Sequence, residues 1–317
     1  MRKVVCIMLV LLCAVGMSVF AAAQQETRQE ITIGLFVKDS TTPYWRYLIK
    51  GAKDEAARIG GVKVIEYAPI KQQDIEEQLR QVEDAIQRRI SAIAIAPIDS
   101  NAIAPALEKA VKAGIPVITT NTRAFYDGIT SFVGVDNIDG GLMLGKYLAE
   151  KMNFTGNIVI VEGNPAGQTN IDRMEGFKKA FAQYPNIKIL TSQPAMFRRD
   201  QAMSVMENIL QTHSKIDAVV AFNDEMAIGA VQAIEAAGRK GIMVTGFDGA
   251  PEGIKAIIAG RMLATLNQGP FEQGGFAVRA AVDVIQGKTI SKWITTGGNI
   301  IDAKNAETEL KRFDGLL

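Results

Sequence analysis

The chain has 317 residues, 48% of them hydrophobic, and its 35 basic and 34 acidic side chains give a formal net charge of +1. This length and apolar content suffice for two domains of ordinary size. Because the charges nearly balance and form no block, the composition does not favour a nucleic acid as a partner.

The first 23 residues have the layout of a secretory signal peptide. Arg2 and Lys3 form a short basic start, residues 4–20 are almost wholly apolar, and Ala21-Ala22-Ala23 offers a cleavage site before a polar leader at 24–30. We therefore expect an exported, periplasmic protein. A retained membrane anchor is the alternative, because about 18 apolar residues can span a bilayer.

Both cysteines of the chain lie inside this predicted signal peptide. Cleavage after Ala23 would remove Cys6 and Cys13 together with two basic residues, which changes the formal charge from +1 to −1. The mature chain would then have no disulfide, so its stability would come from core burial. Lipid attachment at Cys13 is an alternative, although Leu12 is bulky where a lipoprotein signal usually has a small residue.

From residue 31 onward, apolar runs alternate with amphipathic segments, and the same order is found twice, over 31–120 and over 157–247. Strands are predicted at 31–37, 62–67, 91–96, 115–120, 157–161, 187–191, 218–222 and 242–247. Between them, helices are predicted at 43–59, around 75–86, at 101–113, around 174–181, around 205–210 and at 225–237. Strands that alternate with helices through short loops indicate parallel sheets with right-handed crossovers.

The predicted fold class is α/β, with two doubly wound, Rossmann-like parallel-sheet lobes joined by three hinge crossovers. The chain would cross near Asp136, around the strand 263–267 and helix 271–285, and around 298–301. The N-terminal lobe would comprise 31–135 plus about 269–297, and the C-terminal lobe 136–268 plus about 298–317. Ligands bind at the carboxyl ends of parallel strands, so two lobes that face each other would form a binding cleft.

Polar and aromatic side chains gather directly after the predicted strands. The first half contributes Lys38, Thr42, Tyr44, Trp45, Asn121 and Thr122. The second half contributes Arg173, Phe197, Asn223, Asp248 and, on a crossover, Gln268. Planar polar groups can bond to vicinal hydroxyls, and aromatic rings can stack on the apolar face of a sugar, although Tyr44 and Trp45 could simply pack on their helix. This set indicates a small, neutral, polyhydroxylated ligand.

Two charged residues of this set are expected to be costly unless a ligand contacts them. Arg173 would sit at the start of a helix, where a cation opposes the helix dipole, and its guanidinium can fork two hydrogen bonds onto hydroxyls or a carboxylate. Asp248 would project from a buried strand, where an unpaired carboxylate is unfavourable. Ligand hydroxyls together with Arg173 could supply its donors. After another strand, Asp99 or Ser100 is expected to cap a helix.

A series of short segments carries a family resemblance across nearly the whole mature chain. They are Ala94-Ile95-Ala96-Pro97-Ile98-Asp99-Ser100, Gly114-Ile115-Pro116-Val117-Ile118-Thr119, Val135-Asp136-Asn137, Arg173-Met174-Glu175-Gly176-Phe177, Ser192-Gln193-Pro194-Ala195, Phe222-Asn223-Asp224-Glu225-Met226-Ala227 and Val244-Thr245-Gly246-Phe247-Asp248-Gly249. With them, the chain resembles a type I periplasmic binding protein of the D-ribose-binding group, the soluble receptors of bacterial sugar importers.

The resemblance implies roles for individual residues and partners. The aromatic stackers of the family match Tyr44, Trp45 and Phe197, and its hydrogen-bonding set matches Arg173, Asn223, Asp248 and Gln268, with Thr42 at another contact position. It further implies a monomer that closes on its ligand about a hinge, uses no cofactor or metal, and delivers the ligand to an ABC permease in the inner membrane. A chemoreceptor is a second conceivable partner.

Departures from the family pattern put ribose itself in doubt. Lys38 stands where the ribose group has a small hydroxyl residue, Ala96 where it has Asn, and Asn121-Thr122 where it has an Asp-Arg pair. Arg123 would point elsewhere. Lys38 near the cleft mouth leaves room for an anionic sugar, although a solvated lysine is the simpler expectation. Pentose, hexose, polyol, a furanone-type signal and a uronic acid all remain open.

Other function classes find little support. No phosphate-binding glycine motif is present, and the single histidine, His213, is expected in an exposed turn, so neither a metal site nor a Ser-His triad is predicted. We therefore expect no enzyme. A transcription regulator with this type of effector fold would need a DNA-binding headpiece where the chain has a signal peptide. A chemosensory receptor component would look the same in sequence.

Overall fold

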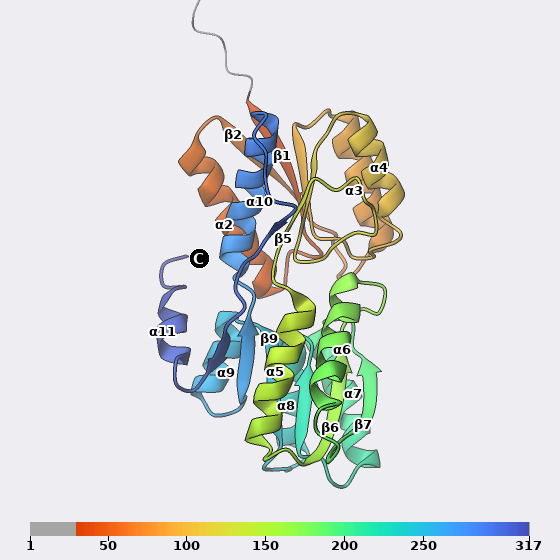
Figure 1. The fold of residues 1–317 in the computed structure, drawn as a ribbon, viewed down its shortest axis with the longest axis vertical. Coiled ribbons are helices and arrows are strands. Elements are labelled where there is room, and N and C mark those ends of the chain that lie inside the picture. The colour runs from red at the N-terminus through yellow and green to blue at the C-terminus, as the bar shows by residue number, and fades with distance from the viewer. Residues whose placement is uncertain (1–29, 317) are drawn as a thin grey trace, which may run out of the picture.

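The computed structural model describes residues 30–316, which form two lobes stacked end to end (Figure 1). Each lobe contains one six-stranded sheet. The first sheet consists of β1 (Ile31–Phe36), β2 (Val62–Tyr67), β3 (Ala92–Ile95), β4 (Val117–Thr120), β5 (Ser131–Val133) and β11 (Trp293–Ile294). The second consists of β6 (Gly156–Glu162), β7 (Ile187–Pro194), β8 (Ala218–Ala221), β9 (Met243–Asp248), β10 (Ala264–Asn267) and β12 (Ile300–Asp302).

The strands follow the same order in both lobes, β11-β5-β4-β3-β1-β2 and β12-β10-β9-β8-β6-β7. All pairs are parallel except β10 and β12, which run antiparallel. The central strands β3 and β8 are buried at every position, as expected for strands that are covered by helices on both faces. The predicted pair of doubly wound lobes is thereby confirmed.

Helices cover both faces of the sheets. The first lobe contains α2 (Pro43–Ile59), α3 (Ile75–Gln87), α4 (Ala104–Lys112) and α10 (Pro270–Ile285). The second contains α5 (Asn137–Lys151), α6 (Gln168–Phe181), α7 (Arg199–Thr212), α8 (Asp224–Ala236), α9 (Pro251–Ile258) and α11 (Ala306–Lys311). In the first lobe, α2 and α10 share one apolar core, while α3 and α4 share another on the opposite face of the sheet. In the second, α5 packs on α6 and α7 on α8.

The chain passes between the lobes three times, between β5 and α5, between β10 and α10, and between β11 and β12. The predicted crossovers are therefore confirmed. In Figure 1, the blue helix α10 lies in the lobe that is otherwise coloured red to yellow. At the first passage, the Asp136 carboxylate accepts hydrogen bonds from the backbone N–H of Ile138 and Asp139 and thereby caps α5.

Glycines allow close docking of α10 and α5, the two helices that directly follow a crossover. On α10, a Cβ at Gly274 would collide with the carbonyl oxygen of Leu48 on α2. On α6, a Cβ at Gly176 would collide with the carbonyl oxygen of Ile138 on α5. Helix backbones approach this closely only where no side chain intervenes. These contacts anchor α10 to the first lobe and α5 to the second.

Several elements depart from the prediction. Helices α5, α9 and α11 and the short strands β5 and β11 were not predicted; α5 carries Gly140, Gly141 and Gly145, which lower its intrinsic helix propensity. The helix predicted at 101–113 begins only at Ala104, because the Asp99 carboxylate accepts the N–H groups of residues 101 and 102 and holds a turn there. His213 ends α7 as expected, but it is half-buried rather than exposed.

Within residues 30–316, no helix is both long and apolar enough to cross a membrane. The predicted signal peptide, with Cys6 and Cys13, and the greater part of the polar leader lie outside the described residues.

Candidate functional site

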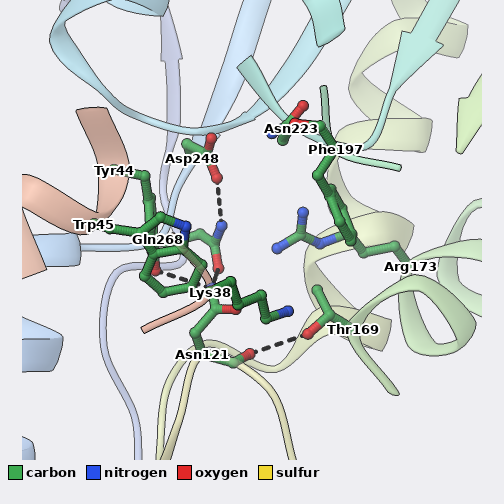
Figure 2. A pocket seen from close by; sticks show the side chains of 10 residues that line it. All are labelled: Lys38, Tyr44, Trp45, Asn121, Thr169, Arg173, Phe197, Asn223, Asp248 and Gln268. Carbon is green, nitrogen blue, oxygen red and sulfur yellow. Dashed lines mark hydrogen bonds between the residues drawn. The ribbon is translucent and has the colours of Figure 1, made fainter. Parts of the chain in front are cut away.

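A cavity with an empty volume of about 320 Å³ lies between the carboxyl ends of the two sheets (Figure 2). Its wall consists of Lys38, Tyr44, Trp45, Asn121, Thr169, Arg173, Phe197, Asn223, Asp248 and Gln268. Of the predicted site residues, the structure brings all to this wall except Thr42 and Thr122.

The wall residues lie at or beyond the carboxyl ends of strands. Lys38 lies in the loop after β1, Tyr44 and Trp45 on the first turn of α2, and Asn121 directly after β4. In the second lobe, Thr169 and Arg173 lie on the helix after β6, Phe197 after β7 and Asn223 after β8, while Asp248 is the last residue of β9. The parallel arrangement of each sheet brings all these strand ends to one edge, and the two edges face each other.

Gln268, in the passage between β10 and α10, connects the wall residues of the first lobe (the first wall) with those of the second lobe (the second wall). Its Oε1 accepts a hydrogen bond from Asn121 Nδ2 at 3.2 Å, and its Nε2 donates to Asp248 Oδ1 at 2.7 Å. Asn121 Nδ2 also donates to the Tyr44 hydroxyl at 3.0 Å, which donates to Gln273 Oε1 at 2.8 Å. One continuous polar chain therefore runs from the first lobe through the crossover to the second. Such networks hold side chains in one geometry.

Arg173 is 1% exposed and lies in the second turn of α6, not at the helix start as predicted, because the helix begins five residues earlier at Gln168. Its Nε donates to Asn137 Oδ1 at 2.9 Å, and Nη1 donates to the backbone carbonyl of Phe222. Its guanidinium carbon lies 3.7 Å from the centre of the Phe247 ring. Burial lowers the pKa of Arg173 to about 10. The group is thus rigidly held, and its Nη2 is buried without a partner.

Asp248 obtains its donors differently from the prediction. Gln268 and the backbone N–H of Asp224 donate to its carboxylate, and Arg173 acts on it through space without a hydrogen bond. Burial, and secondly the nearby Asp224, raise the pKa of Asp248 well above its usual value. Burial likewise raises the pKa of Asp224 to about 7. Asp248 is buried as predicted, but Gln268 and not Arg173 is its direct side-chain donor.

Lys38 is not solvated, so the simpler expectation for it was wrong. It is 3% exposed, donates from Nζ to Thr122 Oγ1 at 2.8 Å, and lies 5.5 Å from the ring centre of Phe197 and 5.9 Å from that of Trp45. Burial, and secondly Arg173, lower its pKa to about 7. The loop after β1 turns inward at this residue, because the following Asp39 carboxylate accepts hydrogen bonds from residues 41 and 42.

The aromatic side chains form three sides of the cavity. Tyr44 and Trp45 meet edge to face with their ring centres 4.9 Å apart, and both are nearly buried. Phe197 approaches from the second lobe with φ of 60°, a conformation that a bulky residue rarely adopts and that is often found at functional sites. A Cβ at Gly163 would collide with the Phe197 ring, so this glycine after β6 allows the ring its place.

The threonines are arranged differently from the prediction. Thr42 does not reach the cavity, since its hydroxyl donates to Asp39 Oδ2 at 2.9 Å. Thr122 lies behind the wall, where it accepts from Lys38 and shares a 2.7 Å hydrogen bond with the Thr169 hydroxyl. Thr169 was missed by the sequence analysis. Its position after the first strand of the second half was the available signal. A threonine on a helix is common in any protein, however, so its residue type alone does not indicate a binding site.

The lobes also touch beyond the cavity, on the side away from the crossovers. Ser100 N donates to the carbonyl of Ala166 at 3.1 Å, and its hydroxyl accepts from Gln168 N at 2.9 Å. Arg123 pairs with Asp172 at 2.8 Å. Of the two residues expected to cap a helix, Asp99 accepts the N–H groups of residues 101 and 102, whereas the Ser100 hydroxyl serves the contact between lobes. The structure represents a closed arrangement, with the cavity enclosed between the crossovers and this rim.

A sequence model described as a periplasmic binding protein domain matches residues 33–289. The chain belongs to the periplasmic binding protein family. This binding protein is similar to the ribose import binding protein RbsB of Bacillus subtilis, with 37% identity over 268 residues that cover 84% of this chain and 86% of the relative. The resemblance seen in the sequence segments is confirmed. The family is one of binding proteins for transport.

Two solved structures share the fold of this binding protein. A solute-binding protein of an ABC transporter from Actinobacillus succinogenes, with bound D-allose, gives a TM-score of 0.82 at 35% identity and covers 87% of this chain and 99% of that one. Another from Bacillus halodurans, with bound myo-inositol, gives a TM-score of 0.84 at 30% identity over 89% and 98% of the two chains. Within residues 30–316, no cluster of His, Cys, Asp or Glu could hold a metal ion.

Proposed function

We propose that this protein captures a small polyhydroxylated ligand, a monosaccharide or polyol, by closing its lobes around it, and delivers it to an ABC-type membrane permease. The observation that carries the proposal is the enclosed cavity, in which aromatic rings from both lobes flank amide, carboxylate and guanidinium groups. Similar proteins are named for ribose or hold D-allose and myo-inositol, which are all ring-sized molecules rich in hydroxyls.

The proposed ligand contacts are the cavity wall residues. Tyr44, Trp45 and Phe197 would stack on the apolar faces of the ligand, since the buried rings of Tyr44 and Trp45 and the half-buried ring of Phe197 line the cavity. Asn121, Thr169, Arg173, Asn223, Asp248 and Gln268 would bond to its hydroxyls, with Lys38 as a further donor. A site of this kind rejects analogues that leave its buried polar groups without partners.

Capture would follow from the division of these contacts between two lobes. We take residues 31–135 with about 269–297 as the N-terminal lobe, and 136–268 with about 298–317 as the C-terminal lobe. In an open state, each lobe would hold only half of the contacts, and closure would bend the three passages. The ligand shifts the equilibrium by its higher affinity for the closed form. The outer surface of that form is the feature that a permease would recognise.

The compartment and partners belong to the same proposal. Export by the signal peptide 1–23 would place the protein in the periplasm as a monomer, where an inner-membrane permease is its main partner and a chemoreceptor a second. A furanone-type signal or an acid sugar is the alternative ligand class. We propose no catalytic role, and turnover of a bound sugar would contradict this.

A thermal-shift screen over pentoses, hexoses, polyols and acid sugars tests the proposal. A ligand present at a hundred times its dissociation constant stabilises the native state by about 2.7 kcal/mol, which such a screen resolves. We expect at least one member to raise the midpoint of unfolding, with titration calorimetry giving one site per chain. If no member of these classes binds, the proposed function is wrong.

A further inference from the structure

The cavity wall carries more positive than negative charge. Its ionisable residues are Lys38 from the first lobe, and Arg173 and Asp248 from the second, besides the phenol of Tyr44. Burial raises the pKa of Tyr44, so its hydroxyl stays neutral. Two cations therefore face one carboxyl group, and all three side chains are nearly buried.

Neither cation has a charged hydrogen-bond partner among the described residues. Lys38 donates to the hydroxyl of Thr122, and Arg173 donates to the amide oxygen of Asn137 and the carbonyl of Phe222. Arg173 Nη2 is buried and has no partner at all. Figure 2 shows the guanidinium of Arg173 and the ammonium of Lys38 directed into the same space between the walls. Two further N–H bonds of the ammonium remain for a ligand.

The carboxylates nearest to Lys38 are already engaged. Asp39 accepts four hydrogen bonds from the backbone and hydroxyl groups of Thr41 and Thr42. Asp248 accepts from Gln268 and from a backbone N–H. Both carboxylates raise the pKa of Lys38, but burial and Arg173 outweigh them and lower it to about 7. Closing the lobes thus buries a cation beside another cation, which is costly without a counter-ion.

We propose that the ligand carries an acidic group, such as the carboxylate of an acid sugar, which binds between the Lys38 ammonium and the Arg173 guanidinium. This inference rests on the proposed function and narrows its ligand class. The guanidinium edge can donate in a fork to a carboxylate, and the ammonium can donate from the opposite lobe. Because the two cations come from different lobes, their repulsion opposes closure until the anion lies between them. The acidic group is therefore also the group that favours the closed state.

The test compares acids with neutral sugars of the same size. Titration calorimetry at pH 6 would use D-galacturonate against D-galactose, D-glucuronate against D-glucose, and D-ribonate against D-ribose. We expect at least one acid to bind at least tenfold more tightly than its neutral partner. If neutral sugars bind and no acid binds better, this inference is wrong while the proposed function stands. If neither class binds, the proposed function fails and the inference with it.

A measurement on the unmodified protein adds a second criterion. The pKa of about 7 belongs to Lys38 buried in the closed form without an anion, whereas an anion at the ammonium favours its protonated form. At pH 8, closure around a neutral sugar should therefore release a proton from Lys38, and closure around the acid should not. Calorimetry detects the release as a heat that changes with the ionisation enthalpy of the buffer, and proton release on binding of the acid would contradict the role of Lys38.

Variants test whether Lys38 causes the preference for the acid. Lys38→Met keeps the length of the side chain and removes the ammonium, so the tenfold preference for the acid should disappear. Lys63→Met, on the exposed face of β2, makes the same change of net charge far from the cavity and should leave the preference intact. A preference for the acid that persists unchanged in Lys38→Met would overturn the proposal for Lys38.

Discussion

The first lobe arranges its strands as β5-β4-β3-β1-β2, and the second lobe repeats the order as β10-β9-β8-β6-β7. Equivalent strand ends therefore face each other across the cavity. The loop after β1 supplies the cation Lys38, and the helix after β6 supplies the cation Arg173. The wall contribution after β4 is the neutral Asn121, whereas the contribution after β9 is the ionisable Asp248. A shared topology thus holds two chemically unequal walls.

The hydrogen bonds of the two walls differ in the same way. The Asn121 amide is already bonded within the protein, since it donates to Tyr44 and Gln268 and accepts from Thr122. Arg173 keeps an unpartnered donor that points into the cavity. The first lobe thus contributes mainly rings and one ammonium to the cavity, and under the proposed function we expect the second lobe to supply the directional hydrogen bonds that select the ligand.

The largest effect is expected from the polar groups of the second wall. Arg173→Ala or Asp248→Ala should abolish measurable binding, because loss of a buried charged contact costs about 2–5 kcal/mol. Calorimetry would measure affinity, and circular dichroism with thermal unfolding would show that the fold persists. Arg173→Lys is the matched variant, since it keeps the charge but loses the fork. Near-normal affinity in either alanine variant would show that the second wall is not the selective one.

The aromatic residues allow a direct comparison of the walls. Trp45→Ala in the first lobe and Phe197→Ala in the second should each weaken binding by about tenfold to a hundredfold, because each removes a ring worth about 1–3 kcal/mol. Phe276→Ala, on the exposed side of α10, is the control and should change affinity little. If only one of the two variants weakens binding, the ligand does not stack on rings from both lobes.

A smaller effect on affinity is expected when Asn121 in the first lobe is replaced by aspartate, the residue type found at Asp248 in the second lobe. Asn121→Asp would place a carboxylate opposite Asp248 and close to Lys38, so that negative charge balances positive charge in the cavity. We expect the affinity for an acid ligand to fall by about tenfold and the ratio of neutral to acid binding to rise. Calorimetry with one matched pair of acid and neutral sugar checks this. Asn121→Leu separates the charge effect from the loss of the amide.

The smallest effect is expected at the rim, which holds the lobes together without touching the cavity. Ser100→Ala removes the hydroxyl that accepts from Gln168 N, a bond that exists only when the lobes are closed. Loss of such a hydrogen bond costs about 0.5–1.5 kcal/mol, so affinity should fall by about threefold to tenfold, with a faster dissociation rate. Stopped-flow dissociation measures it. An unchanged dissociation rate would show that the rim does not stabilise the closed form.

Much of the site could be predicted, because the ends of buried strands can be recognised in the sequence. Charge-free runs such as 31–37 and 218–222 mark buried parallel strands, and residues that follow them must meet at one edge. Tyr44, Arg173 and Asp248 were found in this way, and the structure brings all three to one cavity. The helix α5 was not found, because its glycines argue against a helix until the close packing on α6 that needs them is known.

The chemical state of the site depends on contacts between distant parts of the chain. Two α/β lobes, a cleft at their strand ends and most of the wall residues could be predicted, because they follow from periodicity and chain order. The sequence left other features open. It could not show that Lys38 is buried, that Thr42 turns to Asp39, or that Thr169 reaches the wall. Each of these depends on how one loop folds and how closely two lobes approach. Burial then lowers the pKa of Lys38 to about 7, a property that no local pattern encodes.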